Sequence, residues 1–336
     1  MIDYFEYINN FKRDDDIPSV KIIDNSSNVI PLVTIGIPTY LRKKTLDDAL
    51  KSALDQDFDG LYEIIVLDNN PERNDETEIF MNSFRETPFL SYYKNSRNLG
   101  LPGNWNRIFT LARSKWVVLL HDDDIIAPSF LNEMIAIAEK YNADIVNSEF
   151  YRWDELNSEK PSFCFSQTKY PVVKSTLSSN HLVHFAGMPS GVLYKREVYI
   201  NEGGVNPDFY PSLDYIFQSL LSYKYNFLIY KKPLTIYRLS INVSSNEKTL
   251  KQYIPQDLLF RKYIGTILNY PQFYINLVSK TYSRCRLNAL NIDLVELPEL
   301  NNLKLKRLNK LEFYLFRAYL HLIKKIYTRI NRIGVE

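Results

Sequence analysis

The chain has few of the residues and segments that mark secreted or membrane-spanning proteins. Its two cysteines, Cys164 and Cys285, are too few for a disulfide framework and do not have metal-ligand spacing. The first residues lack the basic start and apolar stretch of a secretory signal, and no apolar run is long enough to cross a bilayer. We therefore expect a cytoplasmic protein in which both cysteines are inert thiols.

The charge of the chain is unevenly distributed, although its formal net value is only +2. Residues 280–336 contain 12 Lys and Arg against 5 Asp and Glu, whereas residues 1–279 contain 29 against 34. This asymmetry predicts that an anionic partner would bind the basic tail alone. The length and the 45% hydrophobic content allow one large domain or one domain with an appendage.

Strand-like and helix-like segments alternate from Leu32 onward. Short apolar runs predict strands at 32–37, 64–67, 90–93, 116–120 and 144–147, and apolar residues at helical spacing predict helices at 46–54, 75–86, 103–113 and 129–140. Such alternation indicates an α/β fold with a mainly parallel sheet and helices on both faces. Residues 150–186 look irregular and polar, 225–237 look strand-like, and the chain from about 256 looks helical to its end.

Three consecutive aspartates, Asp122, Asp123 and Asp124, directly follow the apolar run Trp116–Leu120. Carboxylates at the end of a buried strand repel one another unless a cation, hydrogen bonds or a helix N-terminus offsets their charge. A divalent cation that holds a phosphate group would use all three. The alternative is that Asp124 caps a helix that begins near Pro128 and its neighbours are solvated.

Two other polar segments also follow predicted strands. The segment Pro38–Thr39–Tyr40 ends the first strand of the alternation, and Asp68–Asn69 ends the second. Ligands of parallel α/β sheets bind beyond the carboxyl ends of the strands. These two segments and the three aspartates are therefore predicted to share one binding site.

Taken in order, these segments resemble the GT-A glycosyltransferases of family 2, whose fold binds nucleotide sugars. The resemblance covers about residues 32–240. It rests on residues 33–40, 46–56, 63–69, 98–104, 119–124, 213–214 and 234–238. It implies a GT-A fold and transfer of a sugar from a nucleotide-sugar donor to an acceptor hydroxyl.

The resemblance also implies roles for individual residues. Asp123 is the first choice for binding Mn²⁺ or Mg²⁺, with Asp124 in support, since magnesium usually takes one or two carboxylates plus phosphate oxygens. The nucleotide sugar is expected to contact Pro38, Thr39, Tyr40, Arg42, Asp68, Asn98, Gly100, Asn104 and Asp122. Two of these have alternatives: Asp68 as a turn-forming residue and Tyr40 as an ordinary packed aromatic.

Asp214 resembles the general base of the family. A positioned carboxylate can take the proton of the attacking hydroxyl. Direct attack opposite the leaving group inverts the anomeric carbon, so an α-linked donor would give a β-linked product. The alternative is that Asp214 caps a helix at 215–222, and one residue can do both.

Three residues depart from the family pattern. His121 stands where the first acid of the metal motif often lies, Leu213 replaces a Glu before the base, and Ser240 replaces a His after the segment Tyr237–Arg238. The departures at Leu213 and Ser240 favour a second hypothesis, a sugar-nucleotide-binding protein without transferase activity. A nucleotidyltransferase is a third, but residues 36–40 are not the basic, glycine-rich triphosphate loop that it would need.

Residues 303–333 form the most amphipathic segment of the chain. Apolar residues recur at steps of three and four, and Lys310, Arg317 and Lys324 recur every seven. This pattern suits an anionic membrane surface. Alternatively, the helix packs on the catalytic domain and its basic face is solvated. No nucleic-acid recognition motif accompanies the tail, so we do not expect nucleic acid as a partner.

We accordingly predict an N-terminal extension (1–31), a catalytic domain (32–245) and a helical C-terminal region (246–336). The catalytic domain would divide into a nucleotide-sugar-binding half (32–150) and an acceptor-binding half (151–245). The predicted activity is inverting, metal-dependent transfer, from UDP-sugar to a glycan or lipid-linked oligosaccharide. The predicted setting is bacterial surface-polysaccharide synthesis, such as that of capsule or O-antigen, at the cytoplasmic face of the plasma membrane.

Overall fold

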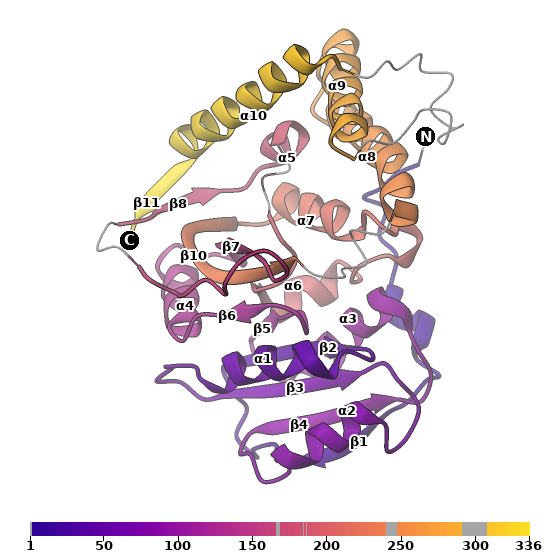
Figure 1. Cartoon of the computed structure of the whole chain (residues 1–336), viewed down its shortest axis with the longest axis vertical. Helices are drawn as coiled ribbons and strands as arrows, with labels where there is room; N and C mark the ends of the chain where they lie inside the picture. The colour runs from indigo at the N-terminus through magenta and orange to yellow at the C-terminus, as the bar shows by residue number, and fades with distance from the viewer. Residues whose placement is uncertain (1, 166–168, 184, 186, 240–246, 291–307) are drawn as a thin grey trace.

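The computed structural model describes residues 2–165, 169–183, 185, 187–239, 247–290 and 308–336. Within them, eleven strands form one sheet with helices on both faces (Figure 1). The order across the sheet is β1-β4-β3-β2-β5-β9-β7-β10-β8-β11, and β6 pairs with β10. The strands are β1 Ser19–Asp24, β2 Val33–Thr39, β3 Tyr62–Asp68, β4 Leu90–Asn95, β5 Trp116–Leu119, β6 Ile125–Ile126, β7 Ile145–Asp154, β8 Pro171–Lys174, β9 Val192–Lys195, β10 Phe227–Leu239 and β11 Arg332–Val335.

The helices lie between these strands and continue beyond them. The α-helices are α1 Lys43–Leu54, α2 Glu76–Met81, α3 Gly100–Leu111, α4 Phe130–Lys140, α5 Leu177–Val183, α6 Arg196–Asn201, α7 Leu213–Lys224, α8 Glu247–Ile267, α9 Gln272–Leu290 and α10 Lys310–Ile330. Short 3₁₀ helices span Asn10–Asp14, Asn82–Phe84 and Pro207–Phe209. The α/β fold with a helical C-terminal region is therefore confirmed.

The parallel pairing predicted from the alternation is found in β4-β3-β2-β5, whose neighbours all run parallel. Strand β9 pairs antiparallel with both β5 and β7, while β7 and β10 are parallel. The whole sheet is therefore mixed, and its parallel part is the half whose strand ends carry the predicted site.

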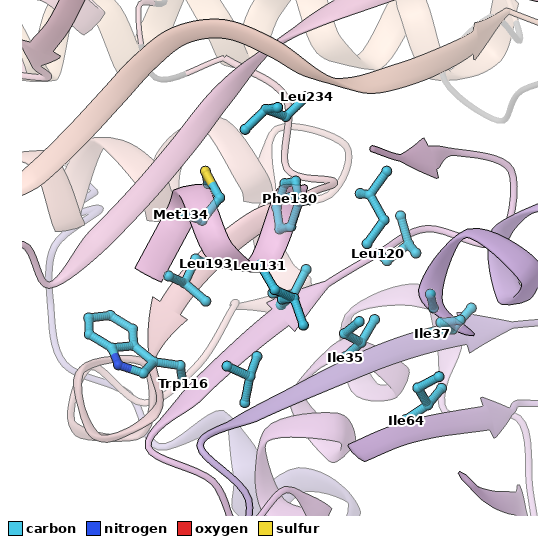
Figure 2. Packing of buried hydrophobic residues seen from close by; sticks show 14 of the residues in the cluster. Ile35, Ile37, Ile64, Trp116, Leu120, Phe130, Leu131, Met134, Leu193 and Leu234 are labelled. Carbon is cyan, nitrogen blue, oxygen red and sulfur yellow. The ribbon is translucent and has the colours of Figure 1, made fainter. Parts of the chain in front are cut away.

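Alternate residues of the buried strands supply the two hydrophobic cores on opposite faces of the sheet. Val118 of β5 packs in the core that includes α1 and α4, and Val117 packs in the core that includes α3 and α7. Figure 2 shows the first core, in which Phe130, Leu131 and Met134 of α4 lie over the strands. Strand β2 is buried at every residue, as expected for a strand covered on both faces.

Residues 2–31 pack onto the rest of the protein. Strand β1 pairs antiparallel with β4 at one edge of the sheet, and Tyr4 packs against Phe260 of α8. The expectation of an irregular stretch at 150–186 is wrong in part, because β7 continues to Asp154 and the stretch also contains β8 and α5. The domain boundaries themselves stay predictions.

The amphipathic helix is shorter than predicted. Residues 303–307 lie outside the described residues, and α10 begins at Lys310 after the N-cap Asn309. The prediction that the helix reaches residue 333 is wrong, because Arg332–Val335 form β11 and pair with β8. Strand pairing therefore fixes the end of α10 to the sheet.

The face of α10 that packs on the protein is not the one with the strongest apolar pattern. Phe316, Leu320, Ile323 and Tyr327 pack against Leu182, Val278 and Tyr282 of α5 and α9. The predicted apolar face instead points to solvent, and its exposed members are Leu311, Leu315, Tyr319, Leu322, Ile326, Ile330 and Ile333. The alternative that this helix packs on the rest of the protein is therefore confirmed, but through a different row of side chains from the predicted one.

A buried histidine, His181 of α5, couples the stability of the helical region to pH. Its side chain is 0% exposed, and neither ring nitrogen has a hydrogen-bond partner within the described parts of the chain. Burial, aided by the positive charge of Arg261, lowers the pKa of His181 to about 4. The unfolded chain takes up this proton below about pH 6.5, whereas the folded chain does not until about pH 4, so stability is lost as the pH falls between these values.

We expect acidification from pH 8 to pH 5 to cost the wild type about 2 kcal/mol more stability than His181→Leu, which has no proton to bind. Urea unfolding of both proteins at the two pH values measures this difference. Equal losses in both proteins would contradict the assignment.

Candidate active site

The polar segments predicted to meet do lie at one edge of the sheet. Strand pairing places Thr39 of β2 beside Asp68 of β3, and Asp68 beside Lys94 of β4. The three aspartates follow β5, the neighbour of β2 on the other side. This edge is the carboxyl end of the parallel half of the sheet, where ligands of such sheets bind.

Asp122 and Asp123 are held by the last residue of β2 and by the N-cap residue of α1. The hydroxyl of Thr39 donates to Asp122 Oδ2 at 2.7 Å. Arg42, the N-cap of α1, donates to Asp123 Oδ2 at 2.8 Å and reaches Asp122 Oδ1 at 3.4 Å. The structure therefore brings together four predicted site residues from two strand ends.

Asp124 is fully buried and only partly satisfied. Its Oδ1 accepts the backbone N–H of Arg238 at 3.1 Å, but its Oδ2 has no hydrogen-bond partner among the described residues. Nδ1 of His121 lies 3.9 Å from that oxygen. The helix-cap alternative for Asp124 is wrong, because α4 begins at Phe130 with Ser129 as its N-cap.

His121, Asp123 and Asp124 form a possible metal site, since one ligand atom from each lies within 4.8 Å of the others. His121 stacks on Trp105 with the ring centroids 5.0 Å apart, and its Nε2 is buried with no hydrogen-bond partner among the residues that the structure describes. The orphaned carboxylate oxygen of Asp124 and two nearby donors fit a divalent cation. His121 was not predicted to bind metal, because family 2 glycosyltransferases often have an acidic residue at this position.

The electrostatics of this cluster also favour a cation. Burial, followed by the charge of Asp123, raises the pKa of Asp122 to about 7 and raises that of Asp124 well above its ordinary value. Burial lowers the pKa of His121 to about 4, which keeps the imidazole neutral and able to bind metal at neutral pH. Ionised carboxylates in such a site are stabilised by a positive charge.

Asp68 is fully buried in an ion pair that the sequence did not predict. Lys94 Nζ and Tyr92 Oη both donate to its Oδ2 at 2.8 Å, and the backbone N–H of Asn70 donates to Oδ1 at 2.9 Å. The bond from Asn70 forms the turn that was expected if Asp68 is a turn-forming residue. Contact of Asp68 with a nucleotide stays a prediction.

Four asparagines join the ends of β3 and β4 to the start of α3. Asn69 donates to Asn98 Oδ1 at 2.8 Å and to the carbonyl of Gly100 at 3.1 Å. Asn95 donates to Asn69 Oδ1 at 3.1 Å and to Asn104 Oδ1 at 2.9 Å. Gly100 has a φ of +70°, a conformation that favours glycine. The predicted residues Asn98, Gly100 and Asn104 are therefore placed by Asn69 and Asn95.

The remaining predicted residues at the end of β2 differ in exposure. Pro38 is buried in the strand and pairs with Leu67 of β3. Tyr40 is 45% exposed, so the packed-aromatic alternative is wrong. Its ring remains accessible for stacking on a planar ligand.

Asp214 lies in the first turn of α7, one residue after the start of the helix. The N-cap of α7 is Ser212, so the alternative that Asp214 is the cap is wrong. Burial raises the pKa of Asp214. Burial raises the pKa of Tyr194 on β9 and of Tyr253 on α8, and the charge of Asp214 adds a smaller contribution to both. A carboxyl with a raised pKa is typical of a group that takes up a proton near neutral pH.

Residues 187–191 connect Asp214 to the metal cluster. The carbonyl of Met188 accepts from Nε2 of Gln218 at 3.3 Å, and Gln218 lies one turn after Asp214 on α7. Two residues further on, Oγ of Ser190 accepts the backbone N–H of His121 at 3.0 Å. Because two residues span at most about 7 Å, α7 and the metal cluster lie at the same end of the sheet.

Arg238 anchors the segment 234–238 beneath the site. Its guanidinium is buried, pairs with Asp48 and Glu155, and lies 4.5 Å from the centre of the Trp153 ring. Its backbone N–H binds Asp124, so the segment helps to place that carboxylate. Ser240, the predicted departure that follows, lies outside the described residues.

About half of the chain matches the model of a known protein family. Residues 34–200 match the family model described as Glycosyl transferase family 2. This range contains β2 to β5 and every predicted site residue except Asp214.

Two curated relatives illustrate the similarity. An uncharacterized glycosyltransferase of Methanocaldococcus jannaschii is 29% identical over 172 residues, which are 50% of this chain and 59% of the relative. The GalNAc(5)-diNAcBac-PP-undecaprenol beta-1,3-glucosyltransferase of Campylobacter jejuni is 30% identical over 117 residues, 34% of this chain and 37% of the relative. The chain therefore matches about three fifths of the first relative's length and less of the second's.

Two solved structures share the fold. S. aureus TarS 1-349 in complex with UDP-GlcNAc has a TM-score of 0.57 at 17% identity, over 80% of this chain and 78% of that chain. The mannosyltransferase PcManGT of Pyrobaculum calidifontis, in complex with GDP-Man and Mn²⁺, has a TM-score of 0.53 at 15% identity, over 96% and 89%. At these identities the similarity concerns the fold alone.

Proposed function

We propose that this chain, a GT-A glycosyltransferase of family 2, transfers a sugar from a UDP-sugar to a glycan or lipid-linked oligosaccharide and inverts the anomeric carbon. The observation that carries the proposal is the convergence of Thr39, Arg42 and the three aspartates at one sheet edge, to which the loop at Met188–Ser190 links α7. A diphosphate donor and an acceptor hydroxyl need a cationic site and a base of this kind.

The donor would lie along the carboxyl edge of the parallel strands. Tyr40 would stack on the base, and Asp68 with the Asn98–Gly100 loop would shape the nucleoside pocket. Arg42 would carry positive charge toward the diphosphate. The structures of TarS with UDP-GlcNAc and of PcManGT with GDP-Man support a nucleotide sugar, and we favour UDP.

Asp123 and Asp124 would hold a divalent cation, with His121 as a third ligand. Such an ion neutralises the negative charge that develops on a leaving diphosphate. Imidazole is a better ligand for Mn²⁺ than for Mg²⁺, which prefers oxygen, so we favour Mn²⁺. The Mn²⁺ in PcManGT supports this choice.

Asp214 would accept the proton of the acceptor hydroxyl as that oxygen attacks the anomeric carbon. Its raised pKa suits this role, because it makes the carboxylate a stronger base than an ordinary aspartate. The attack occurs opposite the leaving diphosphate, so the configuration inverts.

Release of UDP from a panel of UDP-sugars in the presence of Mn²⁺ tests the proposed function. A glycosyltransferase would hydrolyse one donor slowly and would turn over faster with a lipid-linked acceptor. A sugar-nucleotide-binding protein would bind UDP without releasing it from a sugar. A nucleotidyltransferase would release pyrophosphate from a nucleoside triphosphate instead.

The exposed face of α10 indicates where the protein would meet its acceptor. None of the described helices is both long enough and apolar enough to cross a membrane. The exposed apolar row of α10 runs beside Lys310, Arg317, Lys324 and Lys325 on the same helix. An apolar row flanked by cations suits an anionic bilayer surface. We infer that α10 docks the protein peripherally on the cytoplasmic face of the plasma membrane, where it would extend a lipid-linked precursor of a bacterial surface polysaccharide.

We expect the double substitution Leu315→Ser and Leu322→Ser to weaken binding to phosphatidylglycerol-containing vesicles at least about tenfold, since each leucine gains roughly 1.5–3 kcal/mol on full burial. Co-sedimentation with the vesicles measures the change. Leu259→Ser on α8, at a residue 50% exposed, is the matched control and should bind like the wild type. Equal binding by all three proteins would contradict docking through α10.

A further inference from the structure

The guanidinium of Arg42 binds a carboxylate that the proposed divalent cation would also use. Its Nη1 lies 2.8 Å from Asp123 Oδ2 and 3.4 Å from Asp122 Oδ1. Asp123 also belongs to the possible metal site with His121 and Asp124, whose ligand atoms all lie within 4.8 Å of one another. An arginine side chain therefore neutralises one of the carboxylates of that site.

The two sides of this ion pair differ in burial. The side chain of Arg42 is 31% exposed, whereas those of Asp122 and Asp123 are 8% and 9% exposed. A buried carboxylate is costly without a positive partner, but water can solvate a guanidinium that is partly exposed. Arg42 can therefore leave the pair at little cost to itself, provided that another cation replaces it beside the carboxylates.

Arg42 also keeps hydrogen-bond donors in reserve. Nη1 makes both of its bonds to the aspartates, and within the described parts of the chain no hydrogen bond involves its Nε or Nη2. A guanidinium has five N–H donors in a planar fork that matches phosphate oxygens. The side chain is carried by the turn between β2 and α1, where Tyr40 and Leu41 are 45% and 61% exposed, so a change of its rotamer displaces no core residue.

Arg42 and a divalent cation oppose each other at Asp123. Two positive charges beside one carboxylate repel each other, so in the absence of nucleotide the arginine lowers the affinity of the site for metal. A diphosphate changes this balance, because it offers the guanidinium new acceptors and adds negative charge beside the cation. Diphosphate and cation should therefore each strengthen the binding of the other, and the two effects must be equal in size.

We propose that Arg42 is a displaceable counter-ion that couples binding of the divalent cation to binding of the donor diphosphate. In the donor-free protein Arg42 pairs with Asp123 and keeps the affinity for the cation low. When the donor binds, Arg42 moves to the diphosphate and releases Asp123 to the cation. The inference rests on the proposed function and adds regulation of the same site to it: the cation is held tightly only while a diphosphate is present, and Arg42 returns to the carboxylates when UDP leaves.

Titrations of the full chain with Mn²⁺, followed by the electron paramagnetic resonance signal of the free ion, test the proposal. They are made with and without UDP and corrected for the Mn²⁺ that UDP binds in solution. Arg42→Met should bind Mn²⁺ roughly tenfold more tightly than the wild type without UDP, the effect of one charge-assisted contact. The factor by which UDP raises the Mn²⁺ affinity should fall by about the same amount.

Two further variants separate the contact of Arg42 from the general charge of the region. Arg42→Lys keeps the positive charge and should remain closer to the wild type than to Arg42→Met. The matched control is Lys44→Met, which removes a positive charge from the first turn of α1. The side chain of Lys44 is 89% exposed and lies 4.0 Å from Glu155, so its loss should change the Mn²⁺ affinity less than about twofold.

Equal or weaker binding of Mn²⁺ by Arg42→Met without UDP would overturn the proposal. An equal effect of UDP on the wild type and on Arg42→Met would overturn it too, as would a gain in Lys44→Met as large as that in Arg42→Met. Thermal unfolding followed by circular dichroism identifies a variant that does not fold, and Arg42→Gln then replaces Arg42→Met. The proposed function fails separately, if the wild type releases UDP from no donor, because the Mn²⁺ titrations require no turnover.

Discussion

Asp214→Asn is expected to lower the turnover number of sugar transfer by roughly 10²–10⁴-fold, the usual contribution of a positioned general base. The amide has nearly the same shape as the carboxylate but cannot take up the proton of the acceptor hydroxyl. Donor binding should persist, because the residues that hold Asp122 and Asp123 belong to β2 and α1 and not to α7. Transfer rates at saturating acceptor, together with the dissociation constant of UDP, measure the two effects.

The control for this substitution is Asp208→Asn. Asp208 lies six residues before Asp214, is exposed, and pairs with Arg13 at 2.6 Å. An exposed ion pair contributes little, so this variant should transfer sugar at close to the wild-type rate. Near-wild-type turnover by Asp214→Asn with intact UDP binding would rule out the assignment of Asp214 as the base.

The parallel half of the sheet and its edge could be predicted because both follow from local sequence. Buried parallel strands are continuous apolar runs, such as 116–120, and the polar residues that follow them must lie at the carboxyl edge. Thr39, Asp68 and Asp122 were located in this way. Their positions depend on where each strand ends and not on which strand is its neighbour.

The partners of these residues depend on strand pairing, which the sequence does not specify. Lys94 neutralises Asp68 only because β4 lies beside β3 in a register that pairs the two residues. Asn69 and Asn95 meet for the same reason. Strand β1 was missed because most of its residues are only partly buried, as is typical of an edge strand, and its pairing with β4 cannot be read from the sequence.

The packing of α10 could not be predicted from its periodicity. The helix has a second apolar row, Phe316, Leu320, Ile323 and Tyr327, and this row meets the pocket lined by α5 and α9. Ser178 of α5 also bonds the hydroxyl of Tyr327 at 2.6 Å. Hydrophobicity alone predicts that the exposed row would pack on the protein. The row that contains Phe316 and Tyr327 packs instead, because its side chains fit against α5 and α9 and Tyr327 forms a hydrogen bond.

Asp123→Asn is expected to raise the Mn²⁺ concentration needed for half-maximal UDP release by roughly 10–100-fold or more, since even residues that only support a metal ligand cost this much affinity. Asp123 is the central member of the possible metal site with His121 and Asp124. Its only described ion-pair partner is Arg42, which can turn toward a bound diphosphate when a cation takes its place.

Asp122→Asn is the matched control for this prediction, because it removes a buried carboxylate from the adjacent position. Asp122 bonds Thr39 and is not a member of the possible metal site, so it is expected to be the weaker metal ligand. We therefore expect a smaller change in the Mn²⁺ requirement for Asp122→Asn than for Asp123→Asn. Calorimetric titration of Mn²⁺ in the presence of UDP should rank the two variants in the same order. An unchanged Mn²⁺ requirement in Asp123→Asn would contradict the assignment of Asp123 as a metal ligand. A larger change in Asp122→Asn than in Asp123→Asn would assign the metal to Asp122.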